Sequence, residues 1–148
     1  MDHEKYMKIA IDLAYDAAAD GEAPVGCIIV GPDGSVIGRG QNRREREKVA
    51  TAHAELEAIE QACRARGDWR LNGCSLYVTL EPCPMCAGAI IMSRIDRVFY
   101  GARDALTGSC GSVINLFMEP YGHHVQITGG VLADQCSALL TDFFRKLR

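Results

Sequence analysis

Two short segments that are well separated in the chain constrain its fold more than any other feature. The first contains His53 and Glu55, and the second contains Pro82, Cys83 and Cys86. One imidazole and two thiolates offer a zinc ion three protein ligands and leave the fourth tetrahedral position open to water, whereas a structural zinc site normally uses four protein ligands. The fold therefore has to bring both segments together, with Glu55 left over as a carboxylate that can move protons.

The order of apolar and turn-forming residues predicts the elements that carry these segments. A proline- and glycine-containing turn at residues 31–34 joins the first two strands into a hairpin, and helices alternate with strands after it. This order favours a mixed sheet with helices on both faces. The predicted strands are 25–30, 36–40, 75–79, 97–100 and 125–128; the predicted helices are 4–20, 53–66, one that begins at the prolines 82 and 84, and 134–147; loops are predicted at 43–51 and 101–122.

Both ligand segments are predicted at helix N-termini. Cys83 and Cys86 are three residues apart, so in a first helical turn they point to one side, where the helix dipole and free amides favour thiolate over thiol. His53 and Glu55 are two residues apart, which would separate them on a regular helix. They share a site only if His53 stands at the very start of its helix, where the backbone is not yet helical.

This ligand set favours hydrolytic deamination. Zinc lowers the pKa of bound water, and Glu55 could take the water proton, protonate a ring nitrogen and then protonate the leaving amine. A C-x-x-C pair alone is also typical of redox dithiols and of half a zinc knuckle, and an isolated H-x-E is weak. Together, H-x-E and P-C-x-x-C are the known signature of zinc nucleobase deaminases, tRNA adenosine deaminases included, and this chain matches it.

Length and cysteine content predict the setting in which the chain works. Its 148 residues predict a single domain, 1–148, and no stretch is long and apolar enough to suggest a membrane span. Seven cysteines without a recognisable secretion signal indicate a reducing, cytoplasmic location. Five of them lack ligand-like spacing and are expected to act as small buried hydrophobic residues: Cys27, Cys63, Cys74, Cys110 and Cys136.

The net charge of −3 argues against a protein that coats nucleic acid by charge alone, but not against one that recognises a shaped RNA through a local basic rim. Judged by charge alone, the two basic clusters of the chain are expected to be solvated surfaces. They consist of Arg39, Arg43, Arg44, Arg46 and Lys48, and of Arg145, Lys146 and Arg148.

Longer stretches around the motifs resemble the bacterial tRNA-specific adenosine deaminases, and the resemblance covers nearly the whole chain. It implies a cytidine deaminase-like, three-layer α/β/α sandwich with a mixed five-stranded sheet, working as a homodimer in which RNA contacts both subunits. The matching residues are 24–26, 51–55, 76–83, 85–90, 101–104, 107–108, 130–132, Cys136, 139–140 and 143–144.

The resemblance also implies a reaction, which is the hydrolytic conversion of adenosine to inosine at the wobble position of a tRNA anticodon. The implied partner is the anticodon stem-loop, and no DNA substrate is expected. One zinc ion per chain would be held by His53, Cys83 and Cys86, with Glu55 as the proton shuttle. Substrate contacts are implied for Asn42, Ala54, Pro82 and His123.

Three positions depart from the family pattern and bear on RNA binding rather than on the zinc motifs. Leu106 stands where a lysine is common, and Gly122 and His124 replace an amide and a guanidinium. Two alternatives share part of the pattern. A guanine or deoxycytidylate deaminase would use the same zinc chemistry, but residues 101–108 and the last helix resemble the tRNA enzyme. A non-catalytic zinc or RNA-binding module would have no use for Glu55.

Overall fold

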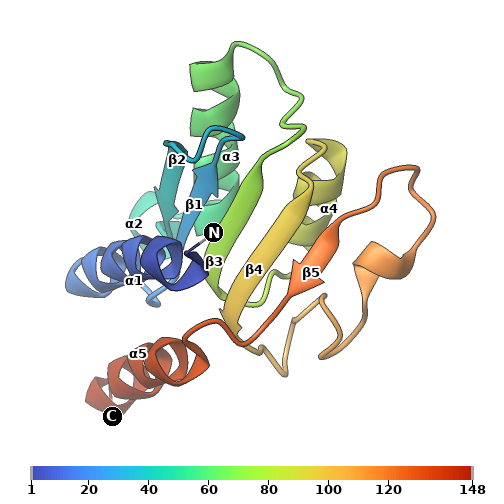
Figure 1. The fold of residues 1–148 in the computed structure, drawn as a ribbon. Coiled ribbons are helices and arrows are strands. Elements are labelled where there is room, and N and C mark those ends of the chain that lie inside the picture. The colour runs from blue at the N-terminus through green and yellow to red at the C-terminus, as the bar shows by residue number, and fades with distance from the viewer. Residues whose placement is uncertain (1, 148) are drawn as a thin grey trace.

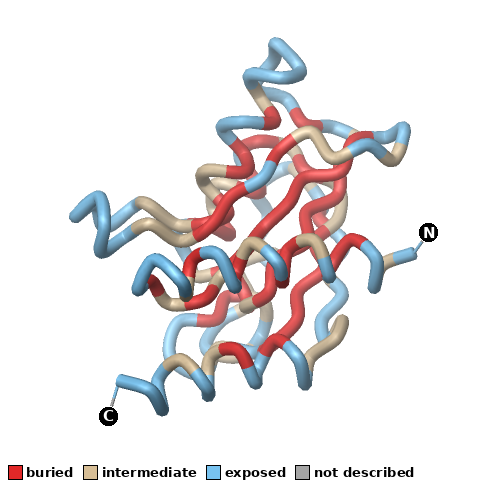
Figure 2. Tube along the Cα trace, turned by 90° about the vertical axis from the view of Figure 1, so that its left-hand side faces the viewer, coloured by how far each residue is buried: buried red, intermediate tan, exposed pale blue. Residues whose placement is uncertain are grey.

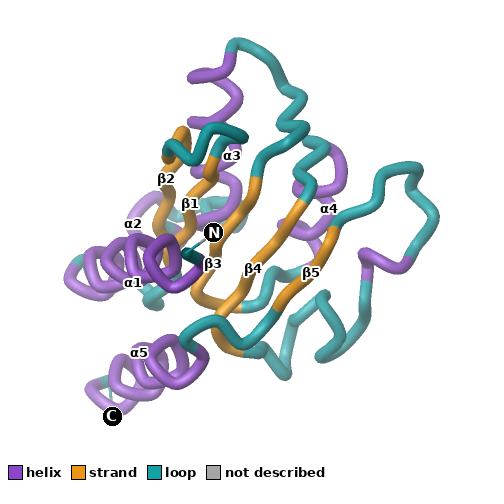
Figure 3. The backbone as a smooth tube through the Cα atoms, viewed as in Figure 1, coloured by secondary structure: helices purple, strands orange, loops and turns teal. Residues whose placement is uncertain are grey.

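A five-stranded sheet forms the middle layer of the computed structural model, which describes residues 2–147 (Figure 1). The predicted order of elements is confirmed, with ends that shift by one or two residues (Figure 3). The elements are α1 (His3–Ala19), β1 (Gly26–Val30), β2 (Val36–Gln41), α2 (Arg44–Glu47), α3 (Ala54–Arg66), β3 (Ser75–Leu80), α4 (Pro84–Met92), β4 (Arg97–Ala102), the 3-10 helix η1 (Leu116–Met118), β5 (Gln126–Thr128) and α5 (Ala133–Lys146).

The sheet is mixed, in the order β2-β1-β3-β4-β5. Strand β1 runs antiparallel to both β2 and β3, whereas β3, β4 and β5 run parallel to one another. Leu80 at the end of β3 pairs with Ala102 at the end of β4. The segments that follow these two strands therefore leave the sheet at the same edge, and the second ligand segment is one of them.

Helices cover both faces of the sheet, which confirms the predicted three layers. Strand β1 is buried throughout, and its side chains alternate between two apolar clusters. Cys27 and Ile29 face α3 and α4, while Ile28 and Val30 face α1 and α5. Figure 2 shows that the buried segments run through the middle of the molecule and the exposed ones along its outside. Burial on both faces explains why β1 is a continuous apolar run rather than an alternating one.

Two glycines of β2 let α3 approach the sheet closely. A Cβ atom added at Gly38 would lie 2.2 Å from the carbonyl oxygen of Ala58, and one added at Gly40 would lie 2.1 Å from that of Ala54. Both distances are far below van der Waals contact, so backbone packs directly on backbone. This contact sets the position of the N-terminus of α3, where His53 lies.

The structure differs from the sequence predictions mainly in the loops. The predicted loop at 43–51 contains the four-residue helix α2, and the stretch 101–122 contains η1. Arg148, at the end of the second basic cluster, lies outside the described residues. Within the described part of the chain, no helix combines the length and apolar character that crossing a membrane would require.

Candidate active site

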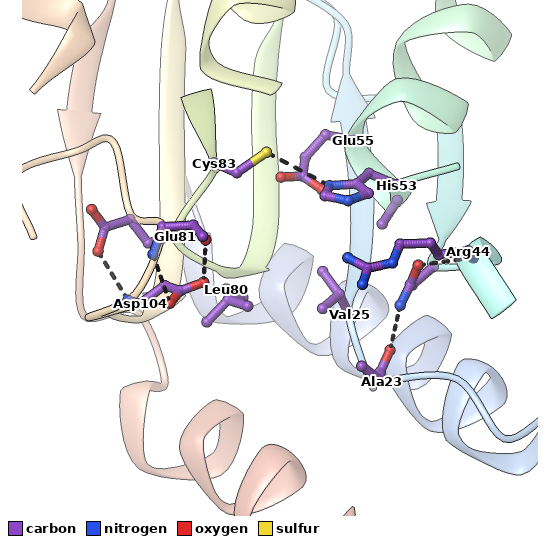
Figure 4. Close-up of a pocket in the computed structure, with 12 residues that line it drawn as sticks. Ala23, Val25, Arg44, His53, Glu55, Leu80, Glu81, Cys83 and Asp104 are labelled. Carbon is purple, nitrogen blue, oxygen red and sulfur yellow. Dashed lines mark hydrogen bonds between the residues drawn. The ribbon is translucent and has the colours of Figure 1, made fainter. Parts of the chain in front are cut away.

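The three predicted zinc ligands meet at one point. The Nδ1 atom of His53 lies 3.7 Å from the Sγ atom of Cys83 and 3.5 Å from that of Cys86, and all three ligand atoms lie within 4.8 Å of one another. Figure 4 shows the Cys83 sulfur directed at the His53 ring. Zinc–sulfur bonds of ~2.3 Å and zinc–nitrogen bonds of ~2.05 Å at a tetrahedral angle would place nitrogen and sulfur roughly 3.6 Å apart. The spacing and donor types therefore fit a tetrahedral zinc ion.

Helix starts position these ligands, as predicted. His53 is the N-cap of α3 and Cys83 is the N-cap of α4, both with extended backbone angles. Pro84 occupies the first turn of α4, where its missing N–H is not needed, and Cys86 follows in the same turn. Because His53 precedes the first helical residue, its ring and the Glu55 side chain reach the same cavity despite their spacing of two (Figure 4).

The pKa values of the two thiols are shifted in opposite directions. A hydrogen bond from Cys86 lowers the pKa of the Cys83 thiol, and a second hydrogen bond from His53 acts in the same direction. The pKa of Cys86 is raised by its hydrogen bond to Cys83 and by burial. A bound dication would favour the thiolate at both positions.

Glu55 is the buried carboxyl of the site, with 4% of its surface exposed. Burial raises the pKa of Glu55 to about 7, and the neighbouring Cys83 acts in the same direction. Figure 4 shows its carboxylate beside the His53 ring. A carboxyl with this pKa can accept a proton and return it near neutral pH, which is what a general acid–base group has to do.

A cavity of about 170 Å³ opens directly on these groups. A larger groove, of about 580 Å³, shares five of its lining residues and extends along α5 to Phe143 and Phe144. The walls of the inner cavity are Ala23, Val25, Asn42, Arg44, His53, Ala54, Glu55, Leu80, Glu81, Cys83, Asp104 and Thr107.

Two of the four residues with implied substrate contacts lie on the cavity wall. Ala54 is buried there, and Asn42 is oriented by two hydrogen bonds. Its Nδ2 donates to the carbonyl oxygen of Ala23 at 3.3 Å, and its Oδ1 accepts the N–H of Arg44 at 3.1 Å. These two hydrogen bonds fix the orientation of the Asn42 amide on the cavity wall.

The other two residues lie off the wall of this cavity. Pro82 is buried beside Cys83, and its carbonyl oxygen accepts the N–H of Ser109 at 2.8 Å. The Nε2 atom of His123 donates to the carbonyl oxygen of Ile95 at 2.8 Å. Ile95 precedes β4, so His123 lies at the sheet edge opposite the cavity. The roles predicted for all four residues remain predictions.

Several residues of the cavity wall were not predicted from the sequence. Arg44, assigned to a solvated surface by charge alone, contributes to both the cavity and the larger groove. Asp104 and Thr107 reach the cavity because β4 is parallel to β3, which no local pattern revealed. Glu81 could have been noticed as a carboxylate between a buried strand and the ligand segment, an unusual place for an unpaired charge.

Comparison with known proteins agrees with this geometry. Residues 1–102 match the family described as the cytidine and deoxycytidylate deaminase zinc-binding region. The chain is 47% identical over 146 residues to a tRNA-specific adenosine deaminase of Bacillus subtilis, covering 98% of this chain and 90% of that protein.

Two solved structures show the same fold. One comes from biochemical and structural studies of A-to-I editing by tRNA:A34 deaminases; it has a TM-score of 0.87 and 41% identity, over 92% of this chain and 99% of that chain. The other is a guanine deaminase from Bacillus subtilis, with a TM-score of 0.68 and 33% identity over 99% and 95%. Sequence and structure both agree better with the adenosine deaminases than with this guanine deaminase. The chain thus belongs to the tRNA-specific adenosine deaminases, within the cytidine and deoxycytidylate deaminase zinc-binding family.

Proposed function

We propose that this chain hydrolytically deaminates adenosine to inosine at the wobble position of a tRNA anticodon. The observation that carries the proposal is the set of three ligand atoms at tetrahedral zinc spacing, beside a buried glutamate and open to a cavity. Its relatives named tRNA-specific adenosine deaminases support the choice of substrate. We place the reaction in the cytoplasm, whose reducing conditions keep cysteines free.

In this proposal one zinc ion per chain is held by His53, Cys83 and Cys86. When bound, it supplies a water of lowered pKa and the positive charge that stabilises developing anionic character. Glu55 accepts one proton from the attacking water and delivers it to the purine ring nitrogen, and then takes the remaining proton of the added hydroxyl and passes it to the departing amine. Water is thereby added at the ring carbon and ammonia leaves, so that adenosine becomes inosine.

The cavity walls orient the base. Asn42 is pre-oriented by its bonds to Ala23 and Arg44, and its amide can hydrogen-bond to the polar edge of a purine without a large loss of side-chain entropy. Ala54 provides a small apolar surface beside Glu55. Pro82 is proposed as a contact on the strength of its place beside Cys83.

We also propose a homodimer, with α4 and the segment after β4 at the interface. Large apolar side chains are exposed there, and a patch of this kind is typical of a protein–protein interface. They are Met85, Met92, Val113, Ile114 and Met118. A dimer would also give His123 a role, because from the far edge of its own sheet it can reach RNA bound mainly by the other protomer.

The oligomeric state can be measured directly by light scattering after size-exclusion chromatography. We expect twice the chain mass for the wild type and a monomer for Met92→Glu, which places a charge in the apolar patch. Tyr15→Glu is the matched control, since Tyr15 is as exposed as Met92 but lies on α1. A wild-type monomer, or dissociation by both substitutions alike, would contradict this interface.

The activity test offers the purified zinc protein an anticodon stem-loop with adenosine at the wobble position. Guanine and deoxycytidylate are offered in parallel. A stem-loop with guanosine at the same position is the control for the identity of the target base. We expect inosine from the first substrate alone. Turnover of guanine or deoxycytidylate without inosine would instead establish a deaminase of free bases or nucleotides.

A further inference from the structure

Glu81 is a buried carboxylate outside the set of proposed zinc ligands and proton-transfer groups. Only 2% of its surface is exposed, and four hydrogen-bond donors surround it. Its Oε1 accepts the N–H of Asp104 at 3.0 Å and the hydroxyl of Ser112, while its Oε2 accepts the N–H groups of Cys110 at 2.8 Å and Ser112 at 3.2 Å. All four donors belong to residues 103–115, which we call the wall segment.

The wall segment is folded directly onto this carboxylate. A Cβ atom added at Gly108 would lie 2.4 Å from the Cδ atom of Glu81, so only glycine allows the approach. Two backbone bonds flank the contact, from the N–H of Glu81 to the Ala102 carbonyl and from the N–H of Ser109 to the Pro82 carbonyl, both 2.8 Å long. Within the wall segment, all of whose residues the structure describes, the only strand-like pairing is the isolated bridge between Cys110 and Asn115, and the carboxylate ties the segment to the end of β3.

The hydrogen bonds indicate that this carboxylate is charged. Its two oxygens face three backbone N–H groups and one hydroxyl, so every partner is a donor and a carboxylate can accept from all of them. A buried anion is tolerated only when it is well hydrogen-bonded. Replacing it with a neutral group would thus leave several N–H donors facing a weaker acceptor.

The same segment forms one side of the cavity. Asp104 and Thr107 line it opposite His53 and Glu55, and the Asp104 carboxylate accepts the Thr107 hydroxyl at 2.8 Å. Figure 4 shows Glu81 bonded to Asp104 on one side of the cavity, with His53 and Glu55 across from them. One side chain, two residues before Cys83, thus joins a ligand-bearing segment to the facing wall.

We propose that Glu81 is a positioning residue that sets the distance between the zinc ligands and the wall formed by Asp104 and Thr107. The inference rests on the proposed function in taking this cavity as the substrate site. Glu81 also lines the cavity, but the hydrogen bonds of its carboxylate all go to the wall segment, so it acts through that segment. Its loss should therefore weaken substrate binding while the zinc site stays filled.

Glu81→Gln is the appropriate variant, because it keeps the size of the side chain and turns one acceptor oxygen into a donor. Glu22 offers a matched control. It is also buried, with 1% of its surface exposed, and it accepts the N–H groups of Glu45 at 3.0 Å and Arg46 at 2.6 Å. Glu22→Gln should loosen the α2 loop and leave the wall segment unaffected.

The first test, amide hydrogen exchange of the zinc-loaded protein by mass spectrometry, is independent of any substrate. Glu81→Gln should speed exchange in peptides covering 103–115 and leave peptides covering 43–48 unchanged, whereas Glu22→Gln should do the reverse. Zinc content should equal that of the wild type in both. Unchanged exchange in the wall segment, or faster exchange throughout the chain, would overturn the assignment of Glu81.

The second test measures steady-state kinetics on the stem-loop. Because buried donors are left poorly satisfied, KM should rise by roughly 5- to 150-fold in Glu81→Gln, with kcat changed much less. A fall in kcat at constant KM would overturn the positioning role. If the wild type does not deaminate the stem-loop, the proposed function fails, and the exchange experiment still decides the role of Glu81.

Discussion

The zinc-binding frame, residues 26–102, and the following stretch, residues 103–147, are built differently. The frame contains four of the five strands, and its core residues are buried against helices on both faces. The later stretch contains the three-residue strand β5 and the short η1, and it leaves Leu106 and Met118 largely exposed. The proposed chemistry lies on the frame, and part of the substrate wall lies on the later stretch.

The two regions are held in place by different interactions. Apolar burial in the frame is spread over many contacts, so no single polar bond decides where His53 or Cys83 lies. The wall segment depends instead on directed hydrogen bonds to Glu81. Apart from Asn42, which faces the cavity, and Glu81, which holds the wall segment, substitutions in the frame are therefore expected to affect chemistry or folding. Substitutions after residue 102 are expected to affect substrate binding.

The largest expected effect is on the ligands in the frame. Cys86→Ala removes one of three zinc ligands and should reduce both zinc content and deamination to background, because the metal-activated water is lost. Metal analysis by mass spectrometry and an inosine assay measure the two quantities. Cys63→Ala is the control, since Cys63 is a free cysteine outside the ligand set. Full zinc occupancy in Cys86→Ala would contradict the ligand assignment.

Next in size is the proton shuttle. Glu55→Gln should keep zinc and fold but slow deamination by ~10²–10⁴-fold, toward the upper end because one carboxyl serves several proton transfers. Single-turnover formation of inosine measures the loss. Glu60→Gln, an exposed change on the same helix, should be neutral. A Glu55→Gln rate within tenfold of wild type would assign proton transfer to another group.

A smaller effect should come from the packing of α3 on the sheet. Gly40→Ala would place a Cβ atom 2.1 Å from the carbonyl oxygen of Ala54 and should lower the free energy of unfolding by about 1–3 kcal/mol, as overpacked cores do. Gly31→Ala, in the turn of the same hairpin, meets its nearest atom, a carboxylate oxygen of Asp33, at 3.3 Å and should change stability less. Urea denaturation compares the two, and equal stability would mean that α3 can shift away from β2.

The smallest effect concerns the later stretch. Leu106 is 87% exposed, so Leu106→Lys should leave stability and zinc content unchanged while adding one phosphate contact. The log–log salt dependence of stem-loop binding should then steepen by about 0.7–0.9. Leu106→Gln controls for polarity without charge. An unchanged slope would place Leu106 away from the RNA.

Local patterns were sufficient to predict most of the frame. Glycine at the end of α3, proline at the start of α4 and the apolar strands act over a few residues, so their effect can be seen in the sequence. The spacing of His53 and Glu55 even required His53 to precede the helix, which the structure confirms. The grouping of His53, Cys83 and Cys86 and the family also followed from the sequence alone.

Only the tertiary structure determined the positions of residues whose partners are distant in the sequence. The parallel pairing of β3 with β4 brings Asp104 to the cavity, and the Glu81 carboxylate folds the wall segment around itself. His123 ends at the edge opposite the cavity because its ring bonds to the carbonyl of Ile95. These positions arise from hydrogen bonds and strand pairs between residues more than twenty positions apart, whereas sequence periodicity reports only which face of a single element is buried.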